Sequence, residues 1–167
     1  PPLPGLDEVG YLTSDTLWGL RELPQRPLVL GGGPIGCELA QSFARLGSQV
    51  TQIEMLPRLM IREDDEVSAF ARQALEADGV TVLTGHKALR CENTAAGKFI
   101  VVECGGAHKR IGFDVLLCAV GRSARLKGFG LEELGIPVDR TVQTNESLQT
   151  IYPNILAAGD VAGPYQF

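Results

Sequence analysis

The sequence predicts an α/β protein built on a parallel sheet, with helices on both faces and a three-stranded antiparallel crossover. Two observations lead to this prediction. Residues 27–85 alternate buried-strand runs with helical patterns in the order β-α-β-α-β, which favours a parallel sheet with right-handed crossovers. Residues 87–113 then hold three short strand-like runs with no helical pattern between them, which is typical of an antiparallel meander.

The first residues lead up to the sheet. Residues 1–12 are rich in Pro and Gly and predict an extended approach segment. Residues 13–23 predict a short helix, because Thr13 or Ser14 can cap its first amides. Pro24 blocks any continuation of that helix, because proline cannot donate the next backbone hydrogen bond.

A strand, a helix and a second strand follow directly. Residues 27–31 are a short apolar run, and the helical period begins at Pro34, which suits a first helical turn. Gly47 suits the helix stop, and the next strand ends on Glu54. The apolar face of this helix is predicted at four positions: Ile35, Leu39, Phe43 and Leu46.

The second helix begins where acids gather at residues 64–66, since acids favour the positive end of a helix. Gly79 ends it, and residues 80–85 are the third strand. After the meander, residues 114–121 predict another buried strand, residues 131–135 at most one short helix, and residues 154–160 a final buried strand. The second helix is predicted to bury Val67, Phe70, Ala71, Ala74 and Leu75.

Composition excludes several functions. The 167 residues are 44% hydrophobic and 21% charged, with a net charge of -5, so the chain lacks the basic surface that nucleic acids and anionic membranes bind. No apolar run approaches the ~18 residues of a membrane helix. The N-terminal residues do not match a signal peptide. We therefore expect a cytoplasmic protein.

Cysteine and histidine usage argues against disulfides and zinc. No two cysteines form a C-x-x-C or C-x₄-C pair, so we expect reduced structural thiols. His86 and His108 have no Cys or acid at metal-ligand spacing, which excludes a zinc site on this pattern. The four cysteines are Cys37, Cys91, Cys104 and Cys118.

The glycine spacing between the first strand and its helix indicates a dinucleotide site. Gly31-x-Gly33-x-x-Gly36 would give a tight turn, close approach of a pyrophosphate, and close packing of helix on strand. Unpaired amides at a helix N-terminus favour an anion. Glu54 ends the next strand, where a carboxylate can accept both hydroxyls of the adenosine ribose. Together these features predict a Rossmann-like fold.

The same acid bears on the choice of cofactor. Glu54 would repel the 2′-phosphate of NADPH, which would need an arginine instead, so the sequence favours NAD(H). Arg58 and Arg62 lie just beyond and keep NADPH open as the alternative.

Three segments together, residues 31–54, 116–124 and 150–164, resemble the flavin-dependent pyridine nucleotide-disulfide oxidoreductases. The resemblance covers essentially the whole chain and implies a homodimeric parent enzyme that uses FAD and NAD(P)H. It also implies that residues 1–24 lead out of an FAD domain and residues 25–143 bind NAD(P)H. Residues 144–167 would begin the returning, incomplete FAD-domain segment.

The resemblance implies roles for further residues. Glu38 would lie near the nicotinamide and pair with a lysine of the FAD domain, and Ala88 would lie against the adenine. Gly121 would approach the dinucleotide with its backbone, and Asp160 would hydrogen-bond the FAD ribityl chain. The pyrophosphate loop would comprise Gly31, Gly33, Pro34, Ile35 and Gly36.

The predicted function is to position the nicotinamide for hydride transfer to FAD, and onward to a disulfide or metal acceptor. The redox-active cysteine pair and the flavin fingerprint of that family do not occur among these residues, so we expect the chain alone to be inactive. Three alternatives stay open: an NADH:acceptor flavoenzyme without a redox disulfide, a self-sufficient nicotinamide dehydrogenase, and a non-catalytic NAD-binding module.

Overall fold

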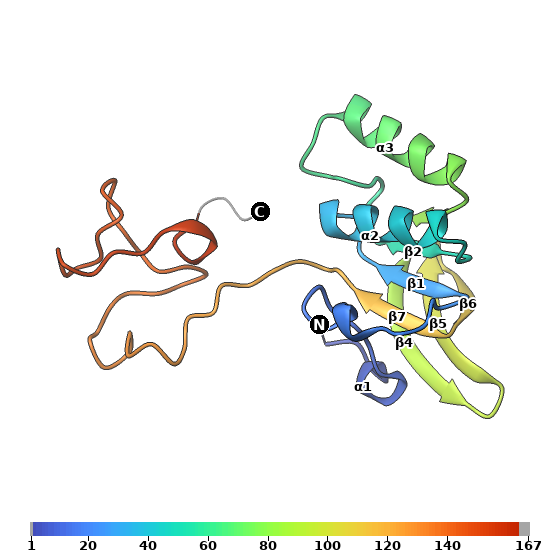
Figure 1. The fold of residues 1–167 in the computed structure, drawn as a ribbon, viewed down its shortest axis with the longest axis horizontal. Coiled ribbons are helices and arrows are strands. Elements are labelled where there is room, and N and C mark those ends of the chain that lie inside the picture. Colours follow the sequence, from blue (N-terminus) through green and yellow to red (C-terminus); the bar gives the residue numbers. More distant parts are fainter. Residues whose placement is uncertain (1, 164–167) are drawn as a thin grey trace. The chain divides into compact units, whose positions relative to one another are not determined.

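The fold is described from a computed structural model, which covers residues 2–163 (Figure 1). Residue 1 and residues 164–167, the end of the predicted FAD-domain segment, lie outside the described part. The chain divides into two compact units, Pro1–Gly121 and Arg122–Phe167. The first unit contains every strand of both sheets.

The centre of the first unit is a four-stranded parallel sheet with the order β3-β2-β1-β7. The chain leaves β1 for β2 on one side, whereas β7 pairs with β1 on the other side. The strand order therefore reverses at the carboxyl end of β1, which is where open α/β sheets bind ligands. The strands are β1 (Pro27–Leu30), β2 (Thr51–Glu54), β3 (Thr81–Thr84) and β7 (Val115–Cys118).

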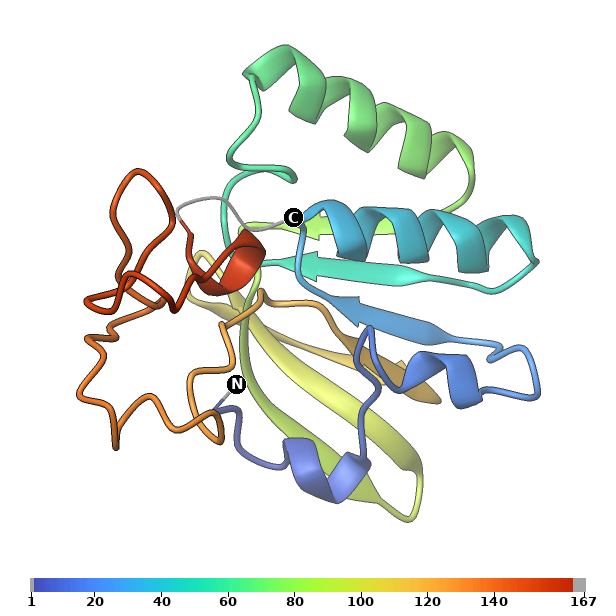
Figure 2. The ribbon, with the colours of Figure 1, turned by 60° about the vertical axis from the view of Figure 1, so that its left-hand side comes forward.

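Two helices, α2 (Pro34–Arg45) and α3 (Asp65–Ala77), cover one face of this sheet (Figure 2). Helix α2 begins with Pro34 at its first turn, as predicted, but it buries the small residues Gly36, Cys37 and Ala40, whereas Leu46 of the predicted apolar face is 67% exposed. Small side chains let the helix backbone approach the sheet closely. The core on this face consists of Leu17, Val29, Cys37, Ala40, Val50, Leu59, Leu75, Val80, Val82 and Leu117.

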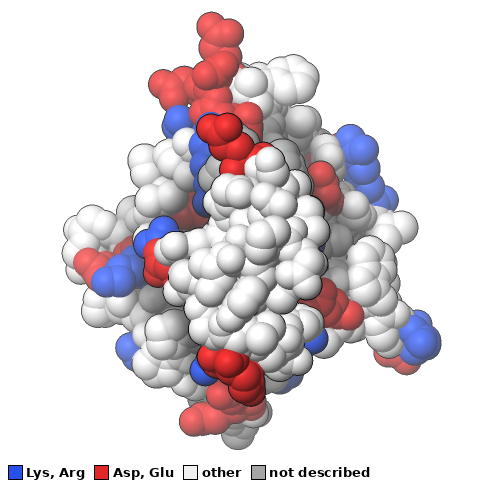
Figure 3. Space-filling model, turned by 90° about the vertical axis from the view of Figure 1, so that its left-hand side faces the viewer, with Lys and Arg blue, Asp and Glu red and all other residues white. Residues whose placement is uncertain are grey.

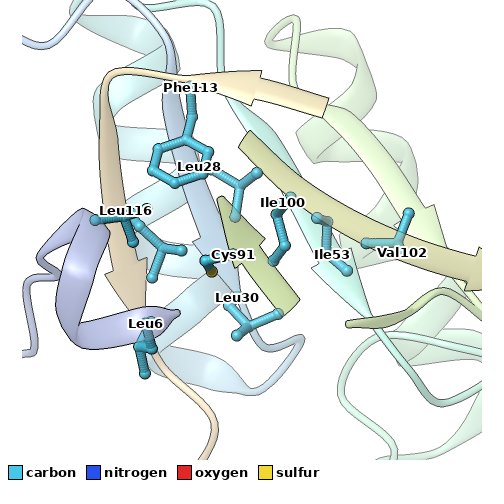
Figure 4. Packing of buried hydrophobic residues seen from close by; sticks show 10 residues of the cluster. Leu6, Leu28, Leu30, Ile53, Cys91, Ile100, Val102, Phe113 and Leu116 are labelled. Carbon is cyan, nitrogen blue, oxygen red and sulfur yellow. The ribbon is translucent and has the colours of Figure 1, made fainter. Parts of the chain in front are cut away.

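The other face is covered by an antiparallel meander with the order β4-β5-β6 and by the one-turn helix α1 (Leu6–Val9) beside β4. Figure 4 shows side chains from the meander, α1 and the parallel strands packed into one cluster. The predicted α/β class and crossover meander are confirmed, and the meander occupies most of the face where a second helical layer was expected. Its strands are β4 (Lys87–Thr94), β5 (Gly97–Cys104) and β6 (Ala107–Phe113).

Two predictions for the N-terminal segment are wrong. Residues 13–23 form only a three-residue 3-10 helix, Leu17–Gly19, although the Thr13 hydroxyl accepts the Asp15 amide as an N-terminal cap does; the chain is extended again from Leu20. Residues 1–12 are not simply extended, since α1 begins after Gly5 in the left-handed region. Helix α1 forms because Leu6 and Val9, one turn apart, both pack into the core.

The predicted buried face of α3 is also partly wrong. Phe70 is 73% exposed and Val67 is exposed too, whereas Ser68 is buried beside Leu75. The Ser68 hydroxyl donates a 2.7 Å hydrogen bond to the Leu59 carbonyl, which satisfies it inside the core. The helix is therefore rotated about its axis relative to the predicted orientation, and it buries the hydrogen-bonded Ser68 in place of Phe70.

The second unit is built from turns. Within residues 122–163 the structure has isolated β-bridges and the 3-10 helix η2 (Gly159–Val161), but no extended strand. The predicted strand at 154–160 is therefore wrong: a buried strand needs partners on both sides, and only Leu156 forms a bridge there, with Gln149. Residues 131–135 form a turn, which is closed by a hydrogen bond from the Ile136 amide to the Leu131 carbonyl.

The surface of this unit carries several exposed apolar side chains. Figure 3 shows the charged side chains, Lys and Arg in blue and Asp and Glu in red, as separate groups with uncharged surface between them. Among the described residues, no helix is long and apolar enough to cross a membrane. The most exposed apolar side chains of the unit are Phe129, Ile151 and Leu156.

Candidate dinucleotide-binding site

The glycine-rich loop leaves the carboxyl end of β1, and two of its glycines are required by close packing. Gly31 has φ 118°, and a Cβ there would strike the carbonyl of Ala119, which follows β7. A Cβ on Gly36 would strike the Gly31 carbonyl. The 2.8 Å hydrogen bond from the Gly31 amide to the Ile53 carbonyl fixes the start of the loop against β2.

Gly33 differs from both of these glycines. Its backbone is extended, and a Cβ there would have nothing within 4 Å among the described residues. Helix α2 has no side-chain cap, and the amides of Ile35 and Gly36 have no acceptor within residues 2–163. This open space before unpaired amides of a 12-residue helix fits a diphosphate, since helix N-termini favour anions.

Glu54 stands at the end of β2, facing the same loop. Its Oε2 accepts the Gly32 amide at 2.6 Å, and its Oε1 accepts the Leu56 amide at 2.7 Å. The carboxylate is half-buried and held in one orientation by these two bonds. Because each carboxylate oxygen has two lone pairs, both oxygens keep acceptor capacity for the hydroxyls of a ribose.

The two arginines beyond Glu54 differ in their contacts. The Arg58 guanidinium donates to the Glu63 carbonyl at 2.8 Å and the Ile61 carbonyl at 3.2 Å, and it pairs with Asp65 at 3.1 Å. These contacts tie Arg58 to the crossover loop before α3. Arg62 is exposed.

The structure brings together part of the predicted site. Gly31 to Gly36 and Glu54 adjoin one another, and Gly121 follows β7 at the same edge of the sheet, with φ 123°. Glu38 is exposed on α2, and Ala88 on β4 is half-buried against the core. Asp160 belongs to the other unit, where it pairs with Arg122 at 3.5 Å.

One buried polar residue at the site was missed from the sequence. Gln52 lies on β2 and is 0% exposed; its Nε2 donates to the Gly31 carbonyl at 3.0 Å and to the Cys37 thiol at 3.5 Å. The available signal was an amide side chain two residues before Glu54, and therefore on the same face of the strand. Sequence spacing did not reveal its partners.

The four thiols are free, and three of them are shielded. Burial raises the pKa of Cys37, although the hydrogen bond from Gln52 opposes this. Burial, with a smaller contribution from Cys118, raises the pKa of Cys91 to about 11. Cys104 is exposed, contrary to the expectation that the cysteines serve as core residues. No cluster of His, Cys, Asp and Glu suited to a metal ion occurs among residues 2–163.

Comparison with known proteins settles the family. The sequence profile described as pyridine nucleotide-disulphide oxidoreductase matches residues 1–167. The chain belongs to the pyridine nucleotide-disulphide oxidoreductase family. It is 43% identical over 146 residues to a dihydrolipoyl dehydrogenase of Thermus scotoductus, covering 85% of this chain and 32% of that protein. It is 37% identical over 169 residues to a mercuric reductase of Staphylococcus aureus, covering 100% of this chain and 31% of that protein.

The structural comparison agrees with the family assignment. The HOCl-induced flavoprotein disulfide reductase RclA of Escherichia coli matches with a TM-score of 0.86 and 33% identity, covering 100% of this chain and 38% of that one. The chain thus spans about a third of the length of its oxidoreductase relatives. The match to RclA covers both compact units of the chain.

Proposed function

We propose that this chain is the NAD(P)H-binding part of a flavin-dependent oxidoreductase. Its role is to position the nicotinamide for hydride transfer to FAD, and onward to a disulfide or metal acceptor. Residues 25–143 would bind the dinucleotide, residues 1–24 would lead out of a flavin domain, and residues 144–167 would return to it. Whole relatives named as dihydrolipoyl dehydrogenase, mercuric reductase and disulfide reductase support this assignment.

The observation that carries the proposal is the pairing of an open loop with a fixed acid. The space at Gly33 and the amides of Ile35 and Gly36, which are unpaired within the described residues, suit the pyrophosphate, while Glu54 presents two oriented oxygens for the ribose. The bound nicotinamide would supply the hydride chemistry. The residues of this chain bind and orient the cofactor, and none of them needs to exchange a proton for that role.

The same contacts support NAD(H) over NADP(H). A 2′-phosphate beside Glu54 would meet a carboxylate, and its compensation would require a guanidinium nearby. Arg58 is tied to carbonyls of the crossover loop and to Asp65, so turning it toward a phosphate would break those contacts. Of the two arginines, Arg62 is the one that could bind a 2′-phosphate without breaking those contacts.

We assign the remaining contacts to the parent enzyme. Glu38 is exposed on α2, where it can pair with a lysine of a flavin domain near the nicotinamide. Ala88 and Gly121 would lie against the adenine and the dinucleotide backbone, and Asp160 would hydrogen-bond the flavin ribityl chain. A cytoplasmic homodimer is the assembly that we expect for the whole enzyme.

Backbone hydrogen exchange tests the proposed binding mode. Addition of NADH should slow exchange at Ile35 and Gly36 and around Leu56, because the pyrophosphate and ribose would cover these amides. The amides of β6, the edge strand of the meander, serve as an internal control, and their exchange rates should not change. Protection confined to other segments would show that the nucleotide binds elsewhere.

A further inference from the structure

Gln52 and Glu54 point to the same side of β2 and hold opposite ends of one peptide group. Gln52 Nε2 donates to the Gly31 carbonyl at 3.0 Å, and Glu54 Oε2 accepts the Gly32 amide at 2.6 Å. That carbonyl and that amide belong to the single peptide bond between Gly31 and Gly32. Two side chains from one strand thus fix the orientation of a peptide plane inside the loop. We call this pair, Gln52 and Glu54, the clamp.

The clamped peptide is one that would otherwise turn easily. Glycine on both sides leaves it without the Cβ contacts that restrict other residues, so rotation of the plane meets little steric resistance. A rotated plane would move the Gly32 amide away from Glu54 and the Gly31 carbonyl away from Gln52, and so change the polar groups that the loop presents. The loop therefore needs a restraint that its own residues do not supply.

Gln52 provides this restraint at a cost to the fold. Its side chain is 0% exposed, and its Oε1 has no hydrogen-bond partner among the described residues. Leaving a buried acceptor unpaired is destabilising. The opposite orientation of the amide would point Oε1 at the Gly31 carbonyl, so the observed orientation is the better one. An apolar side chain at this position would avoid the penalty.

We propose that Gln52 is a positioning residue for dinucleotide binding, which holds the Gly31–Gly32 peptide so that the amides at the start of α2 face the pyrophosphate. This inference rests on the proposed function. Glu54 shares the clamp, but its oxygens also have to serve the ribose. Gln52 is buried away from the cofactor and restrains the peptide whether or not the cofactor is bound.

The test uses Gln52→Met, which keeps the length and volume of the side chain but removes both polar atoms. We expect NADH to bind about threefold to tenfold more weakly, the fold-change that corresponds to one hydrogen bond. Without NADH, the Gly32 amide should exchange faster with solvent. The melting temperature should change little, because removing the unpaired Oε1 offsets the loss of the hydrogen bond to the Gly31 carbonyl.

Gln41→Met is the matched control. Gln41 lies on the same helix as the loop amides, but its Nε2 donates to Asp78 at 2.6 Å, away from the loop. This variant should melt at a lower temperature, while NADH affinity and Gly32 exchange stay at wild-type values. It separates a general loss of a glutamine hydrogen bond from loss of the clamp.

Unchanged NADH affinity or unchanged Gly32 exchange in Gln52→Met would overturn the inference. If the wild-type chain does not bind NADH, the proposed function fails and the exchange experiment alone decides the clamp. In that case, faster exchange at Gly32 in the variant supports the clamp, and unchanged exchange rejects it.

Discussion

A side chain at Gly33 would meet open space, whereas side chains at Gly31 and Gly36 would strike backbone carbonyls. Gly33→Val should therefore leave the free energy of unfolding within about 0.5 kcal/mol of wild type, as for other surface substitutions. It should weaken NADH binding at least about a hundredfold, ~2.7 kcal/mol, because the valine occupies the space of the pyrophosphate. Urea unfolding and calorimetric titration measure the two effects.

Gly31→Ala is the companion variant and should behave in the opposite way. Its φ of 118° and the Ala119 carbonyl leave no room for a Cβ, so the fold should lose about 1–3 kcal/mol. If Gly33→Val bound NADH normally, the glycine spacing would serve only the packing of the loop.

Glu54 is the residue that we propose to set the choice between NADH and NADPH. Glu54→Gln removes the charge and places its NH2 group against one of the two backbone amides that the carboxylate accepts, so NADH should bind at least about tenfold more weakly, since charged hydrogen bonds exceed neutral ones by about 1–1.5 kcal/mol. NADPH should lose less affinity than NADH, because the repulsion of its 2′-phosphate disappears. An unchanged ratio of the two affinities would place the ribose away from Glu54.

At the scale of the elements, strand β4 carries a thiol whose ionisation opposes folding. Burial is the main reason that the Cys91 pKa is raised from 9.0 to about 11. The folded chain thus holds this proton more tightly than the unfolded chain. The resulting stability is complete below pH 9 and is lost as the pH rises through about 11.

Urea midpoints measured from pH 8 to pH 11 test this linkage. Cys91→Ala should lose stability less steeply over the alkaline range than wild type, even though the smaller side chain lowers its stability at pH 8. Cys104→Ala removes an exposed thiol and should follow the wild-type slope. If the urea midpoints of Cys91→Ala and wild type fell in parallel with pH, ionisation of this thiol would not contribute to the loss of stability.

The elements also show which parts of the structure the sequence could predict. Strands β1, β2 and β3 and the position of helix α2 were predictable because apolar runs, Pro34 at the helix start and the glycine stops all agree. The face of α3 was not, because Ser68 is buried through a hydrogen bond to Leu59, which lies outside the helix. Periodicity assigns burial by side-chain polarity and has no information on tertiary partners.

The same limit applies to the site. Glycine spacing and a strand-terminal acid predicted the loop and Glu54, since both follow local rules of backbone geometry and charge. Gln52 was missed because its role depends on the Gly31 carbonyl, which lies 3.0 Å from its Nε2 but belongs to the loop after another strand. The expected strand at 154–160 failed for a related reason: an apolar run alone does not supply strand neighbours.

For the whole molecule, we predict that the 167-residue chain does not retain flavin. Of the contacts that we assign to FAD, only Asp160 is present. One hydrogen bond to a charged group contributes about 1.5–3 kcal/mol, against an association cost of at least about 4 kcal/mol. The chain should purify colourless, stay colourless after mixing with FAD and gel filtration, and oxidise no NADH with disulfide, quinone or mercuric acceptors. Flavin absorbance that survives gel filtration would mean that residues assigned here to NAD(H) build a flavin site.

The most direct test of dinucleotide binding is calorimetric titration of the wild-type chain with NADH and, separately, with NADPH. We predict saturable one-to-one binding of NADH, and weaker binding of NADPH because its 2′-phosphate would face Glu54. Absence of NADH binding would contradict the central claim. Equal or tighter binding of NADPH would show that Arg62, rather than Glu54, governs the ribose end of the site.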